Sequence, residues 1–369
     1  MKFSVSSGDL LNQLLVAAGA IGQNPVVPVL EDFHVSISHN VLTISTSNLE
    51  TTIITSMEVI ASDDGVMAVP AKILMDTLKA LPEQPVTINH DEMSGTIEIL
   101  SSYGKYKLSG DNPEDFPAQP EEQSVQSVKV SATLLSQAIN KTSFATSSDE
   151  VRLAMTGVYM HVDFNKIIFV ATDAHKMVKY SFNDINSDIT ASIILPKKSL
   201  VLLKNNLPQE GDVEILFNNS HAFFKFGNTQ LICRLVDAKY PDYNSVIPFD
   251  NPYTLTLDKN RFQSALKRIA IYANKTTNQV VLNINDGSLT LSAQDLDFSN
   301  EATEQVPCQY DGETLNIGFN AKFLLEMLSV MDSEEVYIKL SSHNRAGILY
   351  PLNDDTSEEL LMLIMPVLR

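Results

Sequence analysis

The sequence contains no apolar run long enough to cross a membrane. A membrane-spanning helix needs roughly 18–20 mostly apolar residues, and no run in this chain of 369 residues approaches that length. The stretch LLVAAGAIG at 14–22 is similar to a signal-peptide core, but Asp9, Asn12 and Gln13 interrupt the segment and only Lys2 precedes it. We therefore expect a cytoplasmic protein that is neither exported nor bound to a membrane.

Cysteine is nearly absent as well. Cys233 and Cys308 lie in strand-like runs far apart in the sequence, without CxxC spacing and without nearby histidines. This pattern excludes a disulfide framework and a thiolate metal site, and it favours buried thiols in a reducing compartment.

The usual catalytic motifs are also missing. The chain has no GxSxG, HExxH, phosphate-binding loop or GxGxxG sequence. The segment ATDAHKM contains Thr172, Asp173 and His175, but a catalytic triad is defined by geometry rather than by neighbours in sequence. We expect a structural turn here, no catalytic residue, no metal and no cofactor. A hydrolase that depends on His175 is the third and weakest alternative.

The chain does contain one unit used three times. A strand followed by an amphipathic helix recurs without gaps at 2–21, 127–146 and 254–273. A second helix recurs at 69–83, 195–209 and 319–333, aligned on Lys72, Lys198 and Lys322. Self-similarity at a fixed spacing is typical of a repeated structural unit. With boundaries in the Pro- and Asp-rich segments 110–123 and 237–252, we predict three domains, 1–123, 124–250 and 251–369.

Alternating, strand-like segments greatly outnumber helices in each unit. The helices predicted from apolar periodicity are 8–21, 71–81, 132–144, 197–207, 259–275 and 321–331. This ratio predicts an α+β fold with two helices per domain on antiparallel sheets. Sheets at both ends of such a chain would have open edges, and a head-to-tail assembly of copies that closes into a ring would cover them.

Charge is distributed unevenly between the helices and the rest of the chain. The net charge is −19, yet the six predicted helices contain 12 Lys and Arg residues against 3 Asp and Glu residues. On the helix at 259–275, Arg261, Arg268 and Lys275 recur every seven residues and would share one face. A solvated helix face is the alternative, but the cations on equivalent helices favour an anionic partner. Because aromatic residues are not interleaved with them, the pattern favours contact with a duplex backbone over base recognition.

The C-terminal segment LIMPVL at 363–368 is apolar, whereas chain ends are normally polar. It is either a last core strand or part of an exposed pocket, and the residues alone leave both alternatives open.

Taken together, these residues resemble the bacterial sliding clamp family, the β subunits of the replicative DNA polymerase. The resemblance covers all three units and is most specific at NPVVPVL (24–30), VPAK (69–72), DNPEDFP (111–117), ATDAHKM (171–177), LVDAKYPDY (235–243), IGFNAKFLLEML (317–328) and MPVL (365–368). It implies a homodimeric ring that encircles duplex DNA and tethers the polymerase, with no nucleotide site or cofactor. It also implies loading by a clamp loader and binding of other proteins that contain a clamp-binding motif.

The resemblance implies three sets of site residues. Facing DNA would be Gln23, Asn24, Lys72, Lys79, Lys141, Lys197, Lys198, Lys204, Arg261, Arg268, Lys275 and Lys322. A pocket for partner peptides with a Gln and a Leu-Phe pair would contain Met155, Thr172, His175, Lys176, Met177, Pro241, Val246, Asn320, Phe323, Met365, Pro366 and Val367. The dimer interface would contain Lys105, Tyr106, Ile271, Tyr272, Glu301 and Glu304.

The chain departs from the family pattern at several of these positions. Asn24 stands where the family often has Arg, and the first helix contains no basic residue. Ala174 and Lys176 replace Gly and Arg, and Asn244 and Ser245 replace two arginines. DNA contact by the first domain and peptide preference are therefore expected to differ from the family. The alternative function is a scaffold that does not bind DNA and whose basic face binds an acidic protein.

Overall fold

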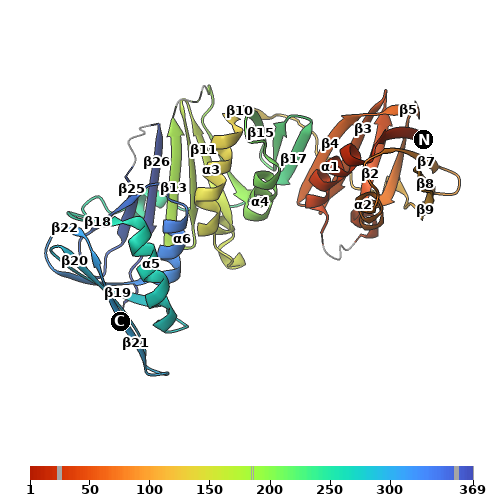
Figure 1. Cartoon of the computed structure of the whole chain (residues 1–369). Helices are drawn as coiled ribbons and strands as arrows, with labels where there is room; N and C mark the ends of the chain where they lie inside the picture. The colour runs from red at the N-terminus through yellow and green to blue at the C-terminus, as the bar shows by residue number, and fades with distance from the viewer. Residues whose placement is uncertain (23–26, 184, 186, 353–356, 369) are drawn as a thin grey trace. The chain divides into compact units, whose positions relative to one another are not determined.

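The structure is a computed structural model that describes residues 1–22, 27–183, 185, 187–352 and 357–368. Its contacts divide the chain into two compact units, each described here by itself (Figure 1). Unit 1 comprises Met1–Leu135 and Lys198–Leu235, and unit 2 comprises Ser136–Lys197 and Val236–Arg369. The three domains predicted above stay a prediction. Among the described helices, none has both the length and the apolar character needed to span a bilayer.

Unit 1 contains two antiparallel sheets. The first has the strand order β5 (Ile60–Asp63), β1 (Lys2–Ser6), β7 (Pro85–Asp91), β8 (Thr96–Leu100) and β9 (Lys105–Ser109). The second has the order β10 (Gln126–Ser131), β15 (Asp212–Phe217), β16 (His221–Phe226), β17 (Thr229–Arg234), β4 (Thr51–Glu58), β3 (Val41–Ser47), β2 (Asp32–Ser38) and β6 (Gly65–Pro70).

Unit 2 also contains two antiparallel sheets. The larger has the order β14 (Ala191–Pro196), β11 (Gly157–Asp163), β12 (Lys166–Thr172), β13 (Lys176–Asn183), β26 (Glu358–Ile364), β25 (Gly347–Pro351), β24 (Glu335–Leu340), β18 (Tyr253–Asp258) and β22 (Gln309–Asp311). The smaller has the order β21 (Asn300–Pro307), β20 (Ser288–Asp295), β19 (Gln279–Asn285) and β23 (Leu315–Asn320).

The six predicted helices are present in the described residues, and each follows directly after a strand. They are α1 (Ser7–Ala17), α2 (Ala71–Ala80), α3 (Ala132–Thr142), α4 (Lys197–Asn206), α5 (Lys259–Ile269) and α6 (Ala321–Ser329). Short 3-10 segments are η1 (Ala18–Ala20), η2 (Pro28–Glu31), η3 (Pro113–Asp115), η4 (Ser143–Ala145), η5 (Glu150–Thr156), η6 (Tyr243–Val246) and η7 (Ala270–Tyr272). In unit 1, α1 contacts α2, and in unit 2, α5 contacts α6 (Figure 1). The predicted α+β class is confirmed.

The fold of helix α5 follows from its sequence. Its buried face contains Phe262, Leu266 and Ile269, the positions that the apolar period predicts. Full burial of each such side chain stabilises the fold by about 1.5–3 kcal/mol. The side chain of Asp258 caps the first turn by accepting a hydrogen bond from the Arg261 N–H at 2.8 Å. These two features place the charged residues of α5 on its outer face.

Helix α5 is shorter than the sequence predicted. The α-helix ends at Ile269 and tightens into η7, whereas the periodic pattern predicted a helix to Lys275. The Asn274 side chain then accepts hydrogen bonds from the N–H groups of Thr276 and Thr277 at 3.0 and 3.3 Å. Such side-chain-to-backbone bonds favour turns over helix, so the predicted end of this helix was wrong.

The sheets show how consecutive repeats are joined. In unit 1, β17 pairs with β4 along Thr229–Cys233, and in unit 2, β13 pairs with β26 along Lys176–Phe182. In both cases the last strand of one group pairs with the outer strand of the group that precedes it in the chain. By strand order, β9 corresponds to β17 and β26, and β21 corresponds to β4 and β13. Within the part of the chain that the structure describes, however, β9 and β21 each have a neighbour on one side only.

Candidate nucleic-acid interface and partner pocket

The cations of the second helices lie where the sequence predicted. Lys72 and Lys79 on α2, Lys197 and Lys198 on α4, and Lys322 on α6 are exposed. Among the described residues, none of these five takes part in an ion pair. Lys204 on α4 is half-buried. Unpaired, exposed ammonium groups such as these can interact with phosphates without sequence preference.

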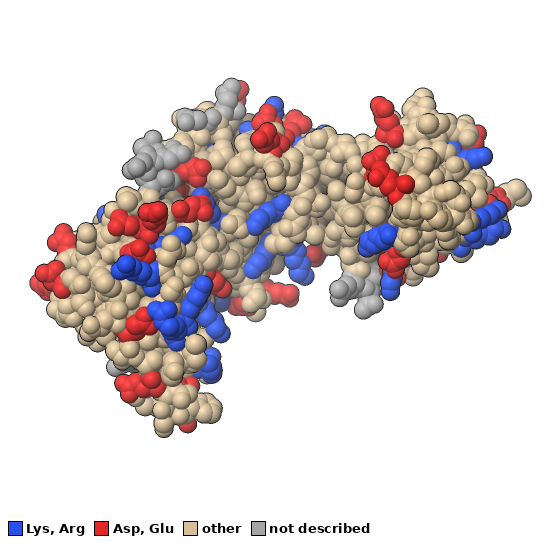
Figure 2. Space-filling view, viewed as in Figure 1, with Lys and Arg blue, Asp and Glu red and all other residues tan. Residues whose placement is uncertain are grey.

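Helix α5 contributes fewer free cations than its sequence indicates. Arg261 is exposed, whereas the guanidinium of Arg268 binds both carboxylate oxygens of Glu304, with Nε to Oε2 at 3.0 Å. The hydrogen bond from Arg268 lowers the pKa of the Glu304 carboxyl. An exposed pair of this kind is worth about 0.2–1 kcal/mol, so a phosphate can compete with Glu304 for Arg268. Figure 2 shows Lys and Arg gathered over α5 and α6 in unit 2.

Lys275 does not belong to the predicted stripe on α5. It lies beyond the end of the helix, is exposed, and donates from Nζ to the carbonyl oxygen of Ile271 at 3.3 Å. The seven-residue spacing therefore does not put it in register with Arg261 and Arg268. Gln23 and Asn24, the other expected contacts outside the helices, lie outside the described residues.

Lys141 differs most from its predicted role of facing DNA. Only 11% of its side chain is exposed, and Nζ lies 3.4 Å from Glu358 Oε2 and 3.6 Å from Asp332 Oδ2. Its ammonium also lies 4.8 Å from the centre of the Tyr180 ring, and the Tyr180 hydroxyl donates to Glu358 at 2.6 Å. A buried, paired ammonium is costly to extract, so Lys141 is less suited to a phosphate contact than the exposed lysines, and we leave it out of the contacts proposed below.

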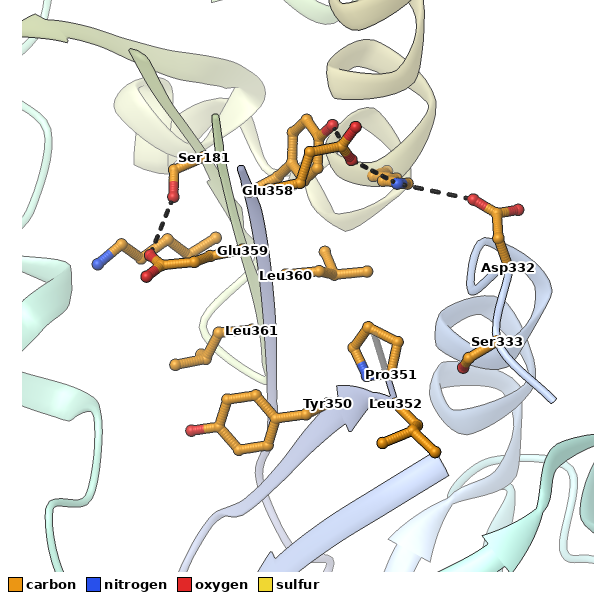
Figure 3. A pocket seen from close by; sticks show the side chains of 13 residues that line it. Ser181, Asp332, Ser333, Tyr350, Pro351, Leu352, Glu358, Glu359, Leu360 and Leu361 are labelled. Carbon is orange, nitrogen blue, oxygen red and sulfur yellow. Dashed lines mark hydrogen bonds and ion pairs between the residues drawn. The ribbon is translucent and has the colours of Figure 1, made fainter. Parts of the chain in front are cut away.

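This cluster lines a cavity of about 510 Å³ in unit 2 (Figure 3). The pairing of β25 with β26 ends at the pair Leu349 and Met362, and the cavity lies beyond this pair. Residues of β13 and β26 form one of its walls. The predicted peptide pocket begins at one end of the paired strands β13 and β26, at the pair Lys176 and Ile364. The cavity lies at the other end of these strands. None of the expected pocket residues lines it.

The turn between β12 and β13 is ordered by its own polar residues. The Thr172 hydroxyl donates to the carbonyl oxygen of Lys176 at 2.8 Å and accepts from the N–H of Ala174 at 3.1 Å. Asp173 Oδ1 accepts from the N–H groups of His175 and Lys176, both at 2.9 Å. These residues therefore form a rigid turn, as the sequence predicted.

The C-terminal segment, for which a last core strand and an exposed pocket were both left open, lies against this turn. The N–H of Met365 donates to the carbonyl oxygen of His175 at 2.9 Å, and the N–H of Val367 donates to Gly318 at 2.8 Å. Gln279 Nε2 donates to the Val367 carbonyl at 3.0 Å. Residues 358–364 form the last core strand, and 365–368 continue as a tail in which Met365 and Leu368 are 42% and 65% exposed. The alternative of a last core strand therefore holds for 358–364, and a pocket formed by the tail stays a prediction.

Phe323 connects the turn to helix α6. Its ring stacks on that of His175 with centroids 6.5 Å apart, and Lys176 Nζ lies 4.1 Å from its centre. Lys176 is 5% exposed and is paired with Glu326 at 2.7 Å and with Asp173 at 3.3 Å. Asn320 caps the helix by accepting from the N–H groups of Lys322 and Phe323. The predicted residues His175, Lys176, Phe323 and Met365 thus lie together.

Several of the remaining predicted pocket residues are adjacent in sequence to members of a small apolar cluster. Met177 is buried in this cluster with Tyr240, and the cluster also contains Ala154 and Ile247. Met155, Pro241 and Val246 each follow or precede one of these residues in sequence, and Val246 is 56% exposed. Pro366 is half-buried beside Met365. Sequence reasoning did not predict Glu326 or Gln279. For Glu326 the available signal was its position three residues after Phe323 on the same helix.

Ala174 is the one residue of the turn with a strained backbone, at φ +74°. An L-residue with its backbone in the left-handed region is destabilised by roughly 1–2 kcal/mol. Glycine avoids this strain, but its unfolded chain has more conformational freedom, which offsets part of the gain. We expect Ala174→Gly to raise the free energy of unfolding by about 0.5–1 kcal/mol in urea titrations. Ala171→Gly, in buried strand β12, is the control and should lower it. Equal destabilisation by both changes would show that Ala174 is not strained.

Three domain models of one family match the chain in sequence. They describe the N-terminal, central and C-terminal domains of the DNA polymerase III beta subunit and match residues 1–120, 129–242 and 244–366. A beta sliding clamp of Staphylococcus aureus is 27% identical over 376 residues and covers 99% of both chains. A beta sliding clamp of Pseudomonas aeruginosa is 28% identical over 365 residues and covers 98% of this chain and 99% of its own.

Solved structures give the same result. The DNA polymerase III subunit beta of Pseudomonas aeruginosa superimposes with a TM-score of 0.95 at 27% identity over 100% of both chains. The DNA polymerase sliding clamp of Bacillus subtilis superimposes with a TM-score of 0.94 at 25% identity, over 100% of this chain and 99% of its own. A further Pseudomonas aeruginosa sliding clamp, solved bound to griselimycin, has a TM-score of 0.94.

Proposed function

The chain belongs to the DNA polymerase III beta subunit family, the bacterial beta sliding clamps, and from this premise we propose how its surfaces serve a DNA sliding clamp. The protein is a DNA sliding clamp for the replicative polymerase. The alternative of a scaffold that does not bind DNA is not favoured.

The observation that carries the proposal is the pair of open edges. Strands β17 and β4, and strands β13 and β26, join consecutive repeats within the chain, and β9 and β21 are the equivalent strands that have no second neighbour. We propose that β9 of one copy pairs with β21 of the other, so that two chains close a homodimeric ring of six domains. Lys105 and Tyr106 lie on β9, and Glu301 and Glu304 lie on β21. Next to β21, Ile271 and Tyr272 are 65% and 42% exposed and would be covered.

Duplex DNA would contact the exposed helix cations of both copies. Lys72, Lys79, Lys197, Lys198, Arg261 and Lys322 are the residues we assign to phosphates, with Arg268 available when it leaves Glu304. Contacts made only to the backbone carry no sequence information. Such a surface can therefore slide along any duplex.

Partner proteins would bind at the turn and tail of unit 2. Phe323, His175 and Met365 form an apolar and aromatic surface, held in place by the hydrogen bonds of the tail. An extended peptide with Leu and Phe side chains could insert between this surface and the cluster around Met177 and Tyr240. The polymerase, the clamp loader and other proteins with the motif would compete for this pocket. Methionine can adapt its shape to different partners.

The proposal includes no catalytic step by this chain. It acts as an accessory subunit of a nucleotidyltransferase, and its place is the cytoplasm, where the free thiols of Cys233 and Cys308 would stay reduced. We retain 1–123, 124–250 and 251–369 as its three domains. Each would contribute one pair of helices to the DNA-facing surface.

Primer extension tests the proposal directly. With the cognate polymerase and loader, addition of this protein should lengthen the products made in one binding event, and the native mass in solution should be twice the chain's 40.7 kDa. Product lengths that do not change, measured with a competitor trap present, would contradict a clamp function. A native mass of one chain would contradict the proposed pairing of β9 with β21.

A further inference from the structure

The junction between the second and third repeats in unit 2 contains a cluster of a tyrosine, a glutamate and a lysine. The Tyr180 hydroxyl of β13 donates to the Glu358 carboxylate of β26 at 2.6 Å (Figure 3). The ammonium of Lys141, on α3, lies 3.4 Å from Glu358 Oε2 and 4.8 Å from the centre of the Tyr180 ring. Lys141 and Tyr180 belong to the second repeat and Glu358 to the third, so the cluster joins two repeats.

Arg268 stands at the position of Lys141 in the third repeat. The gapless match of residues 127–146 with 254–273 aligns these two cations, and both lie on the first helix of their repeat. The Arg268 guanidinium binds both carboxylate oxygens of Glu304 on β21. The third repeat therefore has a cation at the same place, already paired with a carboxylate of its own strand.

Glu304 stands at the position of Tyr180. Strands β13 and β21 each contain a buried residue that lies opposite the first core residue of the preceding strand. These pairs are Ile167 with Phe182 and Leu289 with Val306. Tyr180 and Glu304 each lie two residues before the second member of the pair, so they occupy the same face of equivalent strands. Two of the three groups are thus present in the third repeat, and the described residues contain no strand beyond β21 that could supply the other.

Consecutive repeats join in the same register at both junctions within the chain. Each repeat has a row of directly opposed residues that starts from the equivalent position of its first strand. The rows are Phe3, Ile88, Ile99 and Tyr106; Val128, Ile215, Phe224 and Leu231; and Leu255, Ile338, Leu349 and Met362. The second row continues from Leu231 to Ile53 of β4, and the third continues from Met362 to Val178 of β13. Within the described residues, the first row ends at Tyr106 on the open edge of β9.

The same register would place Tyr106 opposite Ala302 on β21 of a second copy, because Ala302 stands at the position of Val178. Lys107 would then lie opposite Glu301. Opposite charges directly across two antiparallel strands attract each other. The charges of the two edge strands therefore agree with the register that the internal repeats predict.

The Tyr106 hydroxyl would face Glu304 in this register. Gly104 lies two residues before Tyr106 and would lie opposite Glu304. The hydroxyl is 4.0 Å from the position that a Cβ atom would take on Gly104, so the ring extends in that direction. Arg268 and Glu304 line a hollow of about 390 Å³, which leaves room for the end of an aromatic ring. Within its own chain, the hydroxyl makes no hydrogen bond to another described residue.

We propose that Tyr106 of one copy completes the pair of Arg268 and Glu304 in the other, with its hydroxyl donating to Glu304 and its ring lying against the Arg268 guanidinium. This contact rests on the proposed pairing of β9 with β21. The junctions between copies then contain the same kinds of group as the junction within the chain, with tyrosine and glutamate exchanged between the two strands. A hydroxyl bonded to a carboxylate is roughly twice as strong as a neutral hydrogen bond, and a guanidinium against an aromatic ring adds further attraction. The contact holds Arg268 at the interface in competition with phosphate.

Tyr106→Phe tests this contact, because it removes the hydroxyl and keeps the ring. Sedimentation equilibrium of the full chain, without DNA, should give the variant a dimer dissociation constant at least about tenfold higher than wild type, the effect of losing roughly one hydrogen bond to a charged group. Tyr337→Phe is the matched control, because Tyr337 is half-buried on β24, which has a neighbouring strand on each side. It should dimerise like wild type.

Glu304→Ala shows whether the hydroxyl acts on Glu304. In this background, adding Tyr106→Phe should change the dissociation constant by less than about twofold, because the hydroxyl has lost its acceptor. A wild-type dimer that Tyr106→Phe leaves unaffected would overturn the contact while the pairing of β9 with β21 stands. The same loss with and without Glu304 would also overturn the contact, since the hydroxyl would then act on another group. A wild-type chain that stays single at every concentration would overturn both the contact and the dimer.

Discussion

Once loaded, the protein is expected to stay on closed circular duplex DNA as salt rises from about 0.1 M to about 1 M, which shortens the screening length from about 10 Å to about 3 Å. It should leave linear duplex of equal length within the same experiment. A ring retained by topology needs no favourable contact with phosphate, so screening cannot release it. A protein held on one face by six phosphate contacts would instead lose roughly five orders of magnitude in affinity over this range.

The measurement is the fraction of labelled protein that co-elutes with DNA after gel filtration at each salt concentration. Linear DNA with a bulky protein bound at each end is the matched control, because it offers the same contacts but no free end. Retention on the blocked template should equal that on the circle. Equal salt sensitivity of circular, linear and blocked templates would refute encirclement.

Replacing Met365 and Pro366 together by alanine is expected to weaken binding of a partner peptide by about 100-fold, or 2.7 kcal/mol. The reason is that buried apolar anchors carry most of the binding energy at such sites. The N–H groups of Met365 and Val367 hold the tail in place, and both remain in the variant. Fluorescence anisotropy with a labelled peptide that contains Gln and a Leu-Phe pair measures the loss.

Phe164→Ala is the control for this prediction. Phe164 is 67% exposed in the turn between β11 and β12 of the same unit and is not among the pocket residues. It should leave peptide affinity unchanged, and neither variant should alter the native mass or retention on circular DNA. An unchanged peptide affinity in the double variant would remove the pocket assignment.

The repeated fold could be predicted because its helices and strands are specified by residues close together in the sequence. The buried residues Phe262, Leu266 and Ile269 follow the helical period, and capping residues such as Asp258 lie next to the helix they begin. The helix ends were less predictable. A 3-10 turn continues the apolar spacing for a few residues, so the period alone extended α5 beyond Ile269.

The ion pairs of the predicted DNA-facing cations could not be foreseen, for another physical reason. Lys141 is paired with Glu358, 217 residues away in sequence, and Arg268 with Glu304, 36 residues away. A helical pattern shows that a cation is outside the apolar face, but it does not show which carboxylate reaches it. The proposed partner pocket could be suggested only through family resemblance, since its residues come from the turn at 172–177, helix α6 and the C-terminal tail.

In the proposed dimer, the charges on β9 and β21 would influence the polarity with which copies of this chain associate. Edge strand β9 contains Lys105 and Lys107, and edge strand β21 contains Glu301 and Glu304. Homotypic contacts would oppose like charges, β9 against β9 or β21 against β21, whereas the heterotypic contact brings opposite signs together. A newly synthesised chain is thereby expected to favour the arrangement that pairs β9 with β21 over pairings of either strand with its own copy.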